Sequence, residues 1–169
     1  MKRRYLSLFA LIAIVISSLF SCSDGSGEFT HCELTLVLDE SFQAEESEDF
    51  DLLISNGETA VSVIRITFEA GFDSGISDTY TAKGFAAFFM NKNGKSDTLL
   101  MHEHVPYYTY KETVNGSELF YTVTFYRSYN AYFVVTYATR SQNEQLLSDK
   151  FLQYAASAYF NDAPTITTK

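Results

Sequence analysis

In the segment Glu118-Leu-Phe-Tyr-Thr-Val-Thr-Phe-Tyr-Arg127, two sets of residues alternate at period two from Leu119 to Tyr126. Because successive side chains of a strand point to opposite faces, one face of this segment is apolar and the other mixes aromatic rings with threonines. The apolar face carries Leu119, Tyr121, Val123 and Phe125, and the mixed face carries Phe120, Thr122, Thr124 and Tyr126. The pattern predicts a long strand with a core face opposed by a semi-polar aromatic face.

The neighbouring segments extend this strand into a meander. Asn115-Gly116 precedes it and is typical of a tight hairpin turn, since both residues tolerate a positive φ. The sequence Arg127-Ser-Tyr-Asn130 follows it and predicts a looser turn. Three further strands are expected over Thr98–Val105, Tyr107–Val114 and Ala131–Thr139.

The first half of the chain predicts further strands. Leu34, Leu36 and Leu38 recur at period two and indicate a half-buried strand over Glu33–Asp39. Asn56-Gly57 predicts a type I′ turn that joins strands over Phe50–Ile54 and Thr59–Glu69. The second of these strands has apolar residues on both faces, so we expect it to lie centrally in the sheet.

Two helices complete the predicted element order. The first begins at Ser77 or Asp78, runs to about Lys92 and stops at Asn93-Gly94. A strand over Phe85–Met90 is the competing assignment, because Gly84 weakens the helix. The second begins at a capping box of Ser141 and Glu144 and runs to about Phe160.

Short hairpin links and two amphipathic helices predict an α+β domain, with an antiparallel sheet of about six or seven strands and two packed helices. This order resembles the Mog1/PsbP-like fold. The resemblance is carried by the Phe50–Glu69 hairpin, the middle helix, and the tyrosine-rich meander that leads into the Leu146–Phe160 helix. It implies a non-enzymatic accessory protein and assigns no functional residues.

The amino-terminal segment carries a targeting signal. Lys2, Arg3 and Arg4 precede an apolar run, Tyr5–Phe20, of sixteen residues, which is short against the roughly 20 residues that a membrane-spanning helix needs. Leu19-Phe20-Ser21-Cys22 resembles a bacterial lipoprotein processing site, although Phe20 departs from the usual small residue. The resemblance implies cleavage before Cys22, a diacylglyceryl group on its sulfur, and a place at the bacterial cell membrane facing outside the cytoplasm. The alternative is an ordinary secretory signal.

The expected organisation is therefore a signal peptide (1–21), a flexible tether (22–30), one α+β domain (31–162) and a tail (163–169). Removal of the signal, which holds three basic and no acidic residues, would take the net charge from −9 to about −12. Such a domain should be repelled by nucleic acid and by anionic headgroups, so membrane contact is expected through the lipid alone. The acidic stretch Asp39–Asp51 lacks the spacing of an EF-hand loop and is interpreted as a solvated segment.

Two groups of residues are candidate sites. His102 and His104 alternate on the Thr98–Val105 strand, where both imidazoles would share one face and could bind zinc or copper, with solvent-facing histidines as the alternative. Tyr107, Tyr108, Tyr110 and Tyr126 form a candidate aromatic patch for a glycan or an envelope protein. Packing of these rings under the helices is the competing interpretation.

Cys32 is expected to be a packed hydrophobe at the edge of a strand. Its neighbour His31 would point to the opposite face, which argues against a catalytic pair. No cofactor is expected. The sequence thus favours a lipid-anchored binding or assembly module, and the alternative is a metal-dependent or hydrolytic enzyme that uses His102 and His104.

Overall fold

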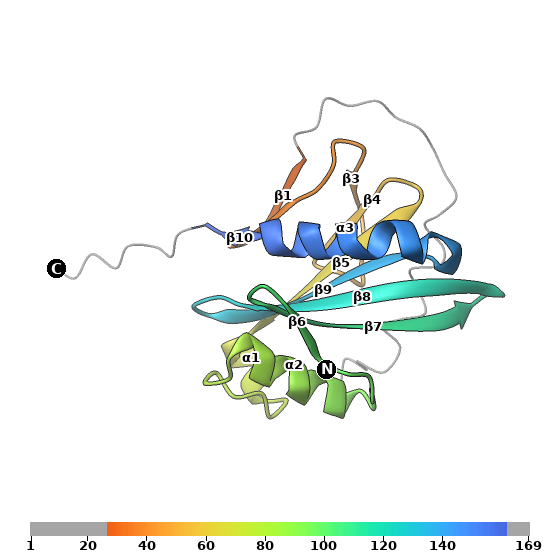
Figure 1. Cartoon of the computed structure of the whole chain (residues 1–169). Helices are drawn as coiled ribbons and strands as arrows, with labels where there is room; N and C mark the ends of the chain where they lie inside the picture. Colours follow the sequence, from red (N-terminus) through yellow and green to blue (C-terminus); the bar gives the residue numbers. More distant parts are fainter. Residues whose placement is uncertain (1–26, 162–169) are drawn as a thin grey trace.

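The chain folds around a seven-stranded antiparallel sheet (Figure 1). The computed structural model describes residues 27–161. The strand order is β3-β4-β5-β9-β8-β7-β6. In that order the strands are Gln43–Glu45, Leu52–Ser55, Thr59–Thr67, Ala131–Arg140, Ser117–Arg127, Val105–Val114 and Leu100–His102. The predicted α+β class and the size of the sheet are confirmed.

Strand β8 has the alternation expected from its sequence, and the turn before it has the predicted geometry. Val114 pairs with Ser117 across a two-residue turn in which Asn115 and Gly116 have φ of 51° and 80°. Positive φ at both positions defines a type I′ turn. At the other predicted hairpin only Gly57 has a positive φ, of 85°. Asn56 instead accepts hydrogen bonds through its side chain from the backbone of Glu58 and Thr59, so the type I′ assignment is wrong there.

Strand β5 is central, as predicted. It pairs with β4 on one side and with β9 on the other. Val61 and Val63 enter the core on one face, while Ile64 and Ile66 pack against the core on the opposite face. The strand ends at Thr67, whose Oγ1 accepts from the Ala70 N–H and caps α1 (Phe68–Phe72), a helix that the sequence patterns did not predict.

Helix α2 (Ala82–Lys92) is the predicted middle helix, and the competing strand is wrong. It begins later than expected because Thr81, in extended conformation, accepts from the Gly84 N–H and caps it, instead of Ser77 or Asp78. The C-cap is Asn93, and Gly94 has φ of 63°, which confirms the predicted stop.

Helix α3 (Glu144–Ser157) follows a short 3₁₀ turn, η3 (Ser141–Asn143). The expected capping box of Ser141 and Glu144 is wrong, because Asn143 precedes the helix in a helical conformation and makes no side-chain cap. The helix ends at Ser157 rather than near Phe160, since Ala158 is extended and leads into a strand.

That strand, β10 (Tyr159–Phe160), belongs to a second, three-stranded sheet with β1 (Glu28–His31) and β2 (Leu34–Val37). The predicted first strand therefore exists but lies outside the main sheet. Strand β1 begins at Glu28, within the segment expected to be a tether. Its residues 28–31 pair with residues 34–37 of β2. Cys22, the predicted signal peptide and the predicted tail lie outside the described residues.

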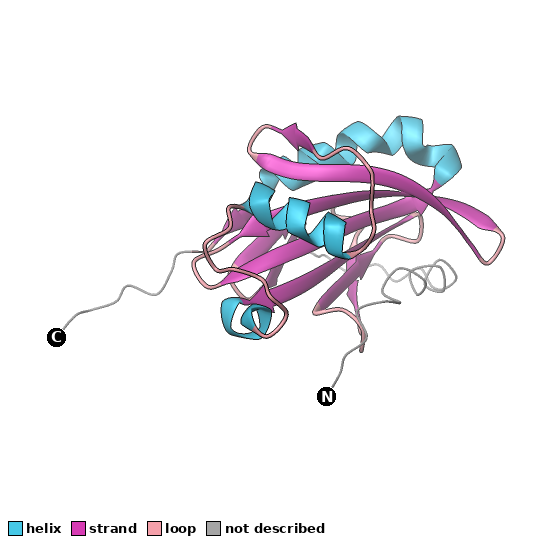
Figure 2. Cartoon of the chain, turned by 90° about the horizontal axis from the view of Figure 1, so that it is seen from below, coloured by secondary structure: helices cyan, strands magenta, loops and turns pink. Residues whose placement is uncertain are grey.

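The two faces of the main sheet are covered by different elements (Figure 1). Helix α3 and strand β2 lie on one face, where Leu34, Leu36 and Phe151 join the core. Helices α1 and α2 lie on the other, and the view from below shows α2 in front of the long strands (Figure 2). There Phe85 of α2 stacks on Tyr132 of β9, with ring centroids 4.2 Å apart.

Candidate functional site

The two candidate metal-binding histidines do not share a strand face. Strand β6 ends at His102, Glu103 has φ of 52°, and His104 lies in the turn before β7. The chain reverses between the two imidazoles, so the prediction that they alternate on one strand is wrong. His104 Nδ1 lies 4.0 Å from the Glu103 carboxylate, and both side chains are exposed. Among residues 27–161, no group of three or more His, Cys, Asp or Glu side chains is arranged to hold a metal ion.

The candidate tyrosine patch is divided between the two faces of the sheet. Tyr107 pairs with Thr124 and so lies on the face of Tyr126, whereas Tyr108 and Tyr110 lie on the opposite face. Tyr126 is buried under α3, where its hydroxyl donates to the Ala155 carbonyl oxygen at 2.9 Å. The prediction of one shared surface is wrong. Side chains at neighbouring positions of β7 point to opposite faces of the sheet, and Tyr126 lies on the face covered by α3, away from α2.

Tyr108 and Tyr110 instead join Tyr121 in a stack of rings on the α2 side. Ring centroids are 5.8 Å apart between Tyr108 and Tyr110, and 4.6 Å apart between Tyr110 and Tyr121. Burial raises the pKa of Tyr121 to about 12, with a further contribution from the charge of Glu112. Burial also raises the pKa of Tyr108 and of Tyr110. These phenols therefore stay neutral at physiological pH, and the stack forms a rigid aromatic wall rather than a source of nucleophiles.

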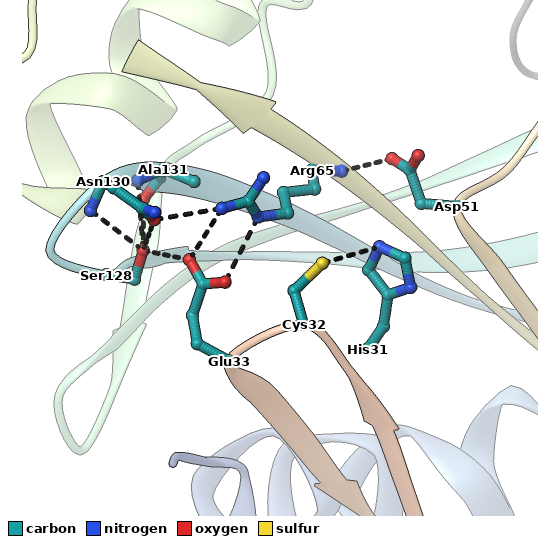
Figure 3. A network of polar contacts seen from close by, with 8 residues as sticks. All are labelled: His31, Cys32, Glu33, Asp51, Arg65, Ser128, Asn130 and Ala131. Atoms are coloured by element: carbon teal, nitrogen blue, oxygen red, sulfur yellow. Dashed lines mark hydrogen bonds and ion pairs between the residues drawn. The ribbon is translucent and has the colours of Figure 1, made fainter. Parts of the chain in front are cut away.

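A network of polar side chains connects the small sheet to the main sheet (Figure 3). Glu33, the second residue of the β1–β2 turn, is 8% exposed. Its two carboxylate oxygens accept from Nε and Nη2 of Arg65 on β5, at 3.2 and 3.3 Å. Ser128 Oγ donates to Glu33 at 2.7 Å, and Asn130 Oδ1 accepts from Arg65 Nη2 at 3.1 Å. The network holds the β1–β2 turn against β5 and the β8–β9 turn.

The balance of forces on Glu33 keeps it charged. Burial alone would raise the pKa of its carboxyl group, but hydrogen bonds from Ser128, from the Glu33 backbone and from Arg65 outweigh burial and lower it. A signal for this pair was present in the sequence, because Arg65 is the one charged residue in the apolar run Ala60–Ile66. A cation in such a strand needs a buried partner, although the sequence does not name that partner.

Cys32 occupies the turn between β1 and β2 rather than a strand (Figure 3). It is exposed and has φ of 53°, so the prediction of a packed side chain is wrong. Its Sγ lies 3.5 Å from Nε2 of His31, because the left-handed conformation turns the thiol back toward its neighbour. The nearby Glu33 and Arg65 are engaged with one another, and among residues 27–161 no third side chain orients the His31 imidazole as a catalytic pair requires.

Among the described residues, no helix is both long enough and apolar enough to cross a membrane.

No protein-family model matches the sequence, and no curated protein matches it. Solved structures do resemble the fold. A crystal structure from Bacteroides thetaiotaomicron has a TM-score of 0.58 and 9% identity, and the match covers 83% of this chain and 50% of that one. The chain thus spans about half the length of that protein. The solution structure of cyanobacterial PsbP from Synechocystis has a TM-score of 0.48 and 11% identity, over 85% of this chain and 99% of that one. Both similarities concern the fold alone.

Proposed function

We propose that the protein is a lipid-anchored binding or assembly module of the bacterial cell envelope, without catalytic activity of its own. The observation that carries this proposal is the sequence Leu19-Phe20-Ser21-Cys22 at the end of a short apolar run that follows three basic residues. The diacylglyceryl group on Cys22 would fix the domain to the membrane on the side away from the cytoplasm.

The start of the fold limits how far such a domain could stand from the bilayer. Strand β1 begins at Glu28, six residues after Cys22. At roughly 3.5 Å per extended residue, this segment reaches about 20 Å. Strand β2, which pairs with β1, leads into exposed Asp39 and Glu40. Asp39 is paired with Lys150, but the Glu40 carboxylate would be repelled by anionic headgroups, so the lipid would tether the domain without drawing it flat onto the surface.

The binding role is supported by the arrangement of the candidate residues. Within residues 27–161 no third group orients His31 and Cys32, His104 lies in the turn that follows His102, and Tyr108 and Tyr126 are buried. A scaffold whose aromatic and polar groups serve packing suits a protein that presents surfaces to partners, such as an envelope protein or a glycan.

Metabolic labelling with a fatty-acid analogue in a bacterial host tests the anchor. We expect label on the wild-type chain and none on a Cys22→Ala variant. A Cys32→Ala variant is the matched control, because it removes the other thiol and should keep the label. Label that persisted in Cys22→Ala would contradict the proposal, and so would a wild-type chain that took none.

A further inference from the structure

Strand β7 has an open outer edge. It is ten residues long, and its outer neighbour β6 pairs only with Val105, Pro106 and Tyr107. The rest of the strand, residues 108–114, pairs with β8 on the inner side, and within residues 27–161 no strand lies on its outer side. This part of β7 is longer than either edge strand of the sheet, β3 or β6, each of three residues.

The hairpin register identifies the free backbone groups. In a two-residue hairpin the closing pair, here Val114 and Ser117, exchanges both of its backbone hydrogen bonds. Alternation then directs the backbone groups of every second residue of β7 away from β8. Val105 and Tyr107 follow the same alternation, since they pair on the outer side with His102 and Leu100. Within residues 27–161, the N–H and C=O groups that point outward without a strand partner are therefore those of Thr109, Lys111 and Thr113.

This edge lacks the usual protection against strand addition. Native edges are often blocked by a bulge, a proline or an outward lysine. The ladder from 107 to 114 has an unbroken register, and Pro106 lies outside it. The ammonium group of Lys111 is held 2.6 Å from the carboxylate of Glu144 at the start of α3, so its charge is partly neutralised on that face of the sheet.

We propose that residues 109–113 of β7 accept an extended strand from a partner protein, and that this strand carries a basic residue opposite Glu112. Glu112 is exposed on the opposite face from Lys111 and forms no ion pair within the described chain. The acidic charge of the whole chain, −9, favours a cationic partner in the same way. Backbone pairing would supply the affinity, and the cross-strand charge pair would supply selectivity.

A second copy of this chain fits the same edge less well. A two-fold ladder centred on Lys111 would place each Glu112 opposite Tyr110 of the other copy, so neither Glu112 carboxylate would gain a cation. The partner is therefore a different protein. This inference rests on the proposed binding role, but it does not depend on the lipid anchor, whose failure the labelling experiment would reveal separately.

The test uses the full chain in detergent and two synthetic peptides. One is acetyl-Ser-Thr-Arg-Thr-Val-Thr-Ser-amide, and the other has Glu in place of Arg. Binding is measured by NMR titration, together with hydrogen exchange of individual amides. We expect the Arg peptide to slow exchange at Thr109, Lys111 and Thr113, and to bind about two- to fivefold more tightly than the Glu peptide.

Variants of the edge sharpen the test. Thr113→Pro removes one outward N–H without touching the ladder to β8, and should weaken binding at least about fivefold. Thr113→Ala keeps the N–H and is its matched control. Glu112→Lys, a surface change that leaves the backbone intact, should reverse the preference between the peptides. Absence of binding at millimolar peptide, or binding without protection of the three amides, would overturn the proposal. Protection that rises with protein concentration alone would show pairing of two copies and overturn it too.

Discussion

Replacement of Arg65 by Met should destabilise the fold by about 3 kcal/mol at pH 7. Methionine keeps an apolar stem near the Phe133 ring, 5.9 Å from the guanidinium carbon in the wild type. It leaves Glu33, 8% exposed, without its cation. Removal of one partner from a buried ion pair costs about 3 to 5 kcal/mol. The lower end applies because Ser128 still donates to the carboxylate at 2.7 Å and because Arg65 itself is 17% exposed.

The loss of stability caused by Arg65→Met should become smaller as the pH falls. In the wild type the pKa of Glu33 is lowered, so this carboxylate adds stability above the unfolded pKa, about 4.3, and loses it as pH falls through the folded value. Without Arg65, its hydrogen bond and its positive charge no longer lower the pKa of Glu33, so the folded pKa would rise. The variant is then penalised while Glu33 is charged and recovers as it is protonated. The difference between the two proteins should therefore shrink between pH 7 and about pH 4.

Urea unfolding of both proteins at several pH values measures this difference. Lys150→Met is the control, since Lys150 and Asp39 form an exposed ion pair and its loss should cost less than about 1 kcal/mol. A loss below about 1 kcal/mol for Arg65→Met at pH 7, or a loss that does not vary with pH, would refute our account of the network.

Two other outcomes follow from burial. Phe85→Ala should lower the free energy of unfolding by about 3 to 5 kcal/mol, because Phe85 is fully buried and stacks on Tyr132. The control Phe72→Ala, at a ring that is 80% exposed, should change it by less than about 0.5 kcal/mol. Equal effects of the two variants in urea unfolding would contradict the assigned core. Cys32 should react with a maleimide in the folded protein at a rate close to that in urea, since its thiol is exposed, and mass spectrometry would detect the adduct; protection that disappears only in denaturant would place it in the core instead.

Local patterns were sufficient for most of the sheet. The alternation in β8, the Asn115-Gly116 turn and the doubly apolar β5 all depend on neighbours in the sequence, and the structure confirms each. Helix starts were less predictable. Several hydroxyl residues precede α2, and the one that caps it, Thr81, is decided by the backbone conformation at that position.

The candidate sites depended on contacts that the sequence does not contain. His102 and His104 have the spacing of strand neighbours, but the chain reverses after His102 so that β7 can pair with β6. Arg65 signalled a buried charge, yet its partner Glu33 is 32 residues earlier in the sequence, in the β1–β2 turn of the other sheet. Residue spacing places two side chains on one face only while the backbone between them keeps one conformation. It does not predict which distant segments will contact each other in the folded protein.

The sequence by itself determined the α+β class and the meander, because periodicity and turn chemistry are local properties. Tertiary structure alone decided that the first strands form a separate sheet and that the tyrosines divide between two faces. It also decided that, among residues 27–161, no strand pairs with the outer edge of β7 beyond Tyr107. Those outcomes depend on register and on which strands become neighbours. Both are set by the burial of the whole core rather than by any single segment.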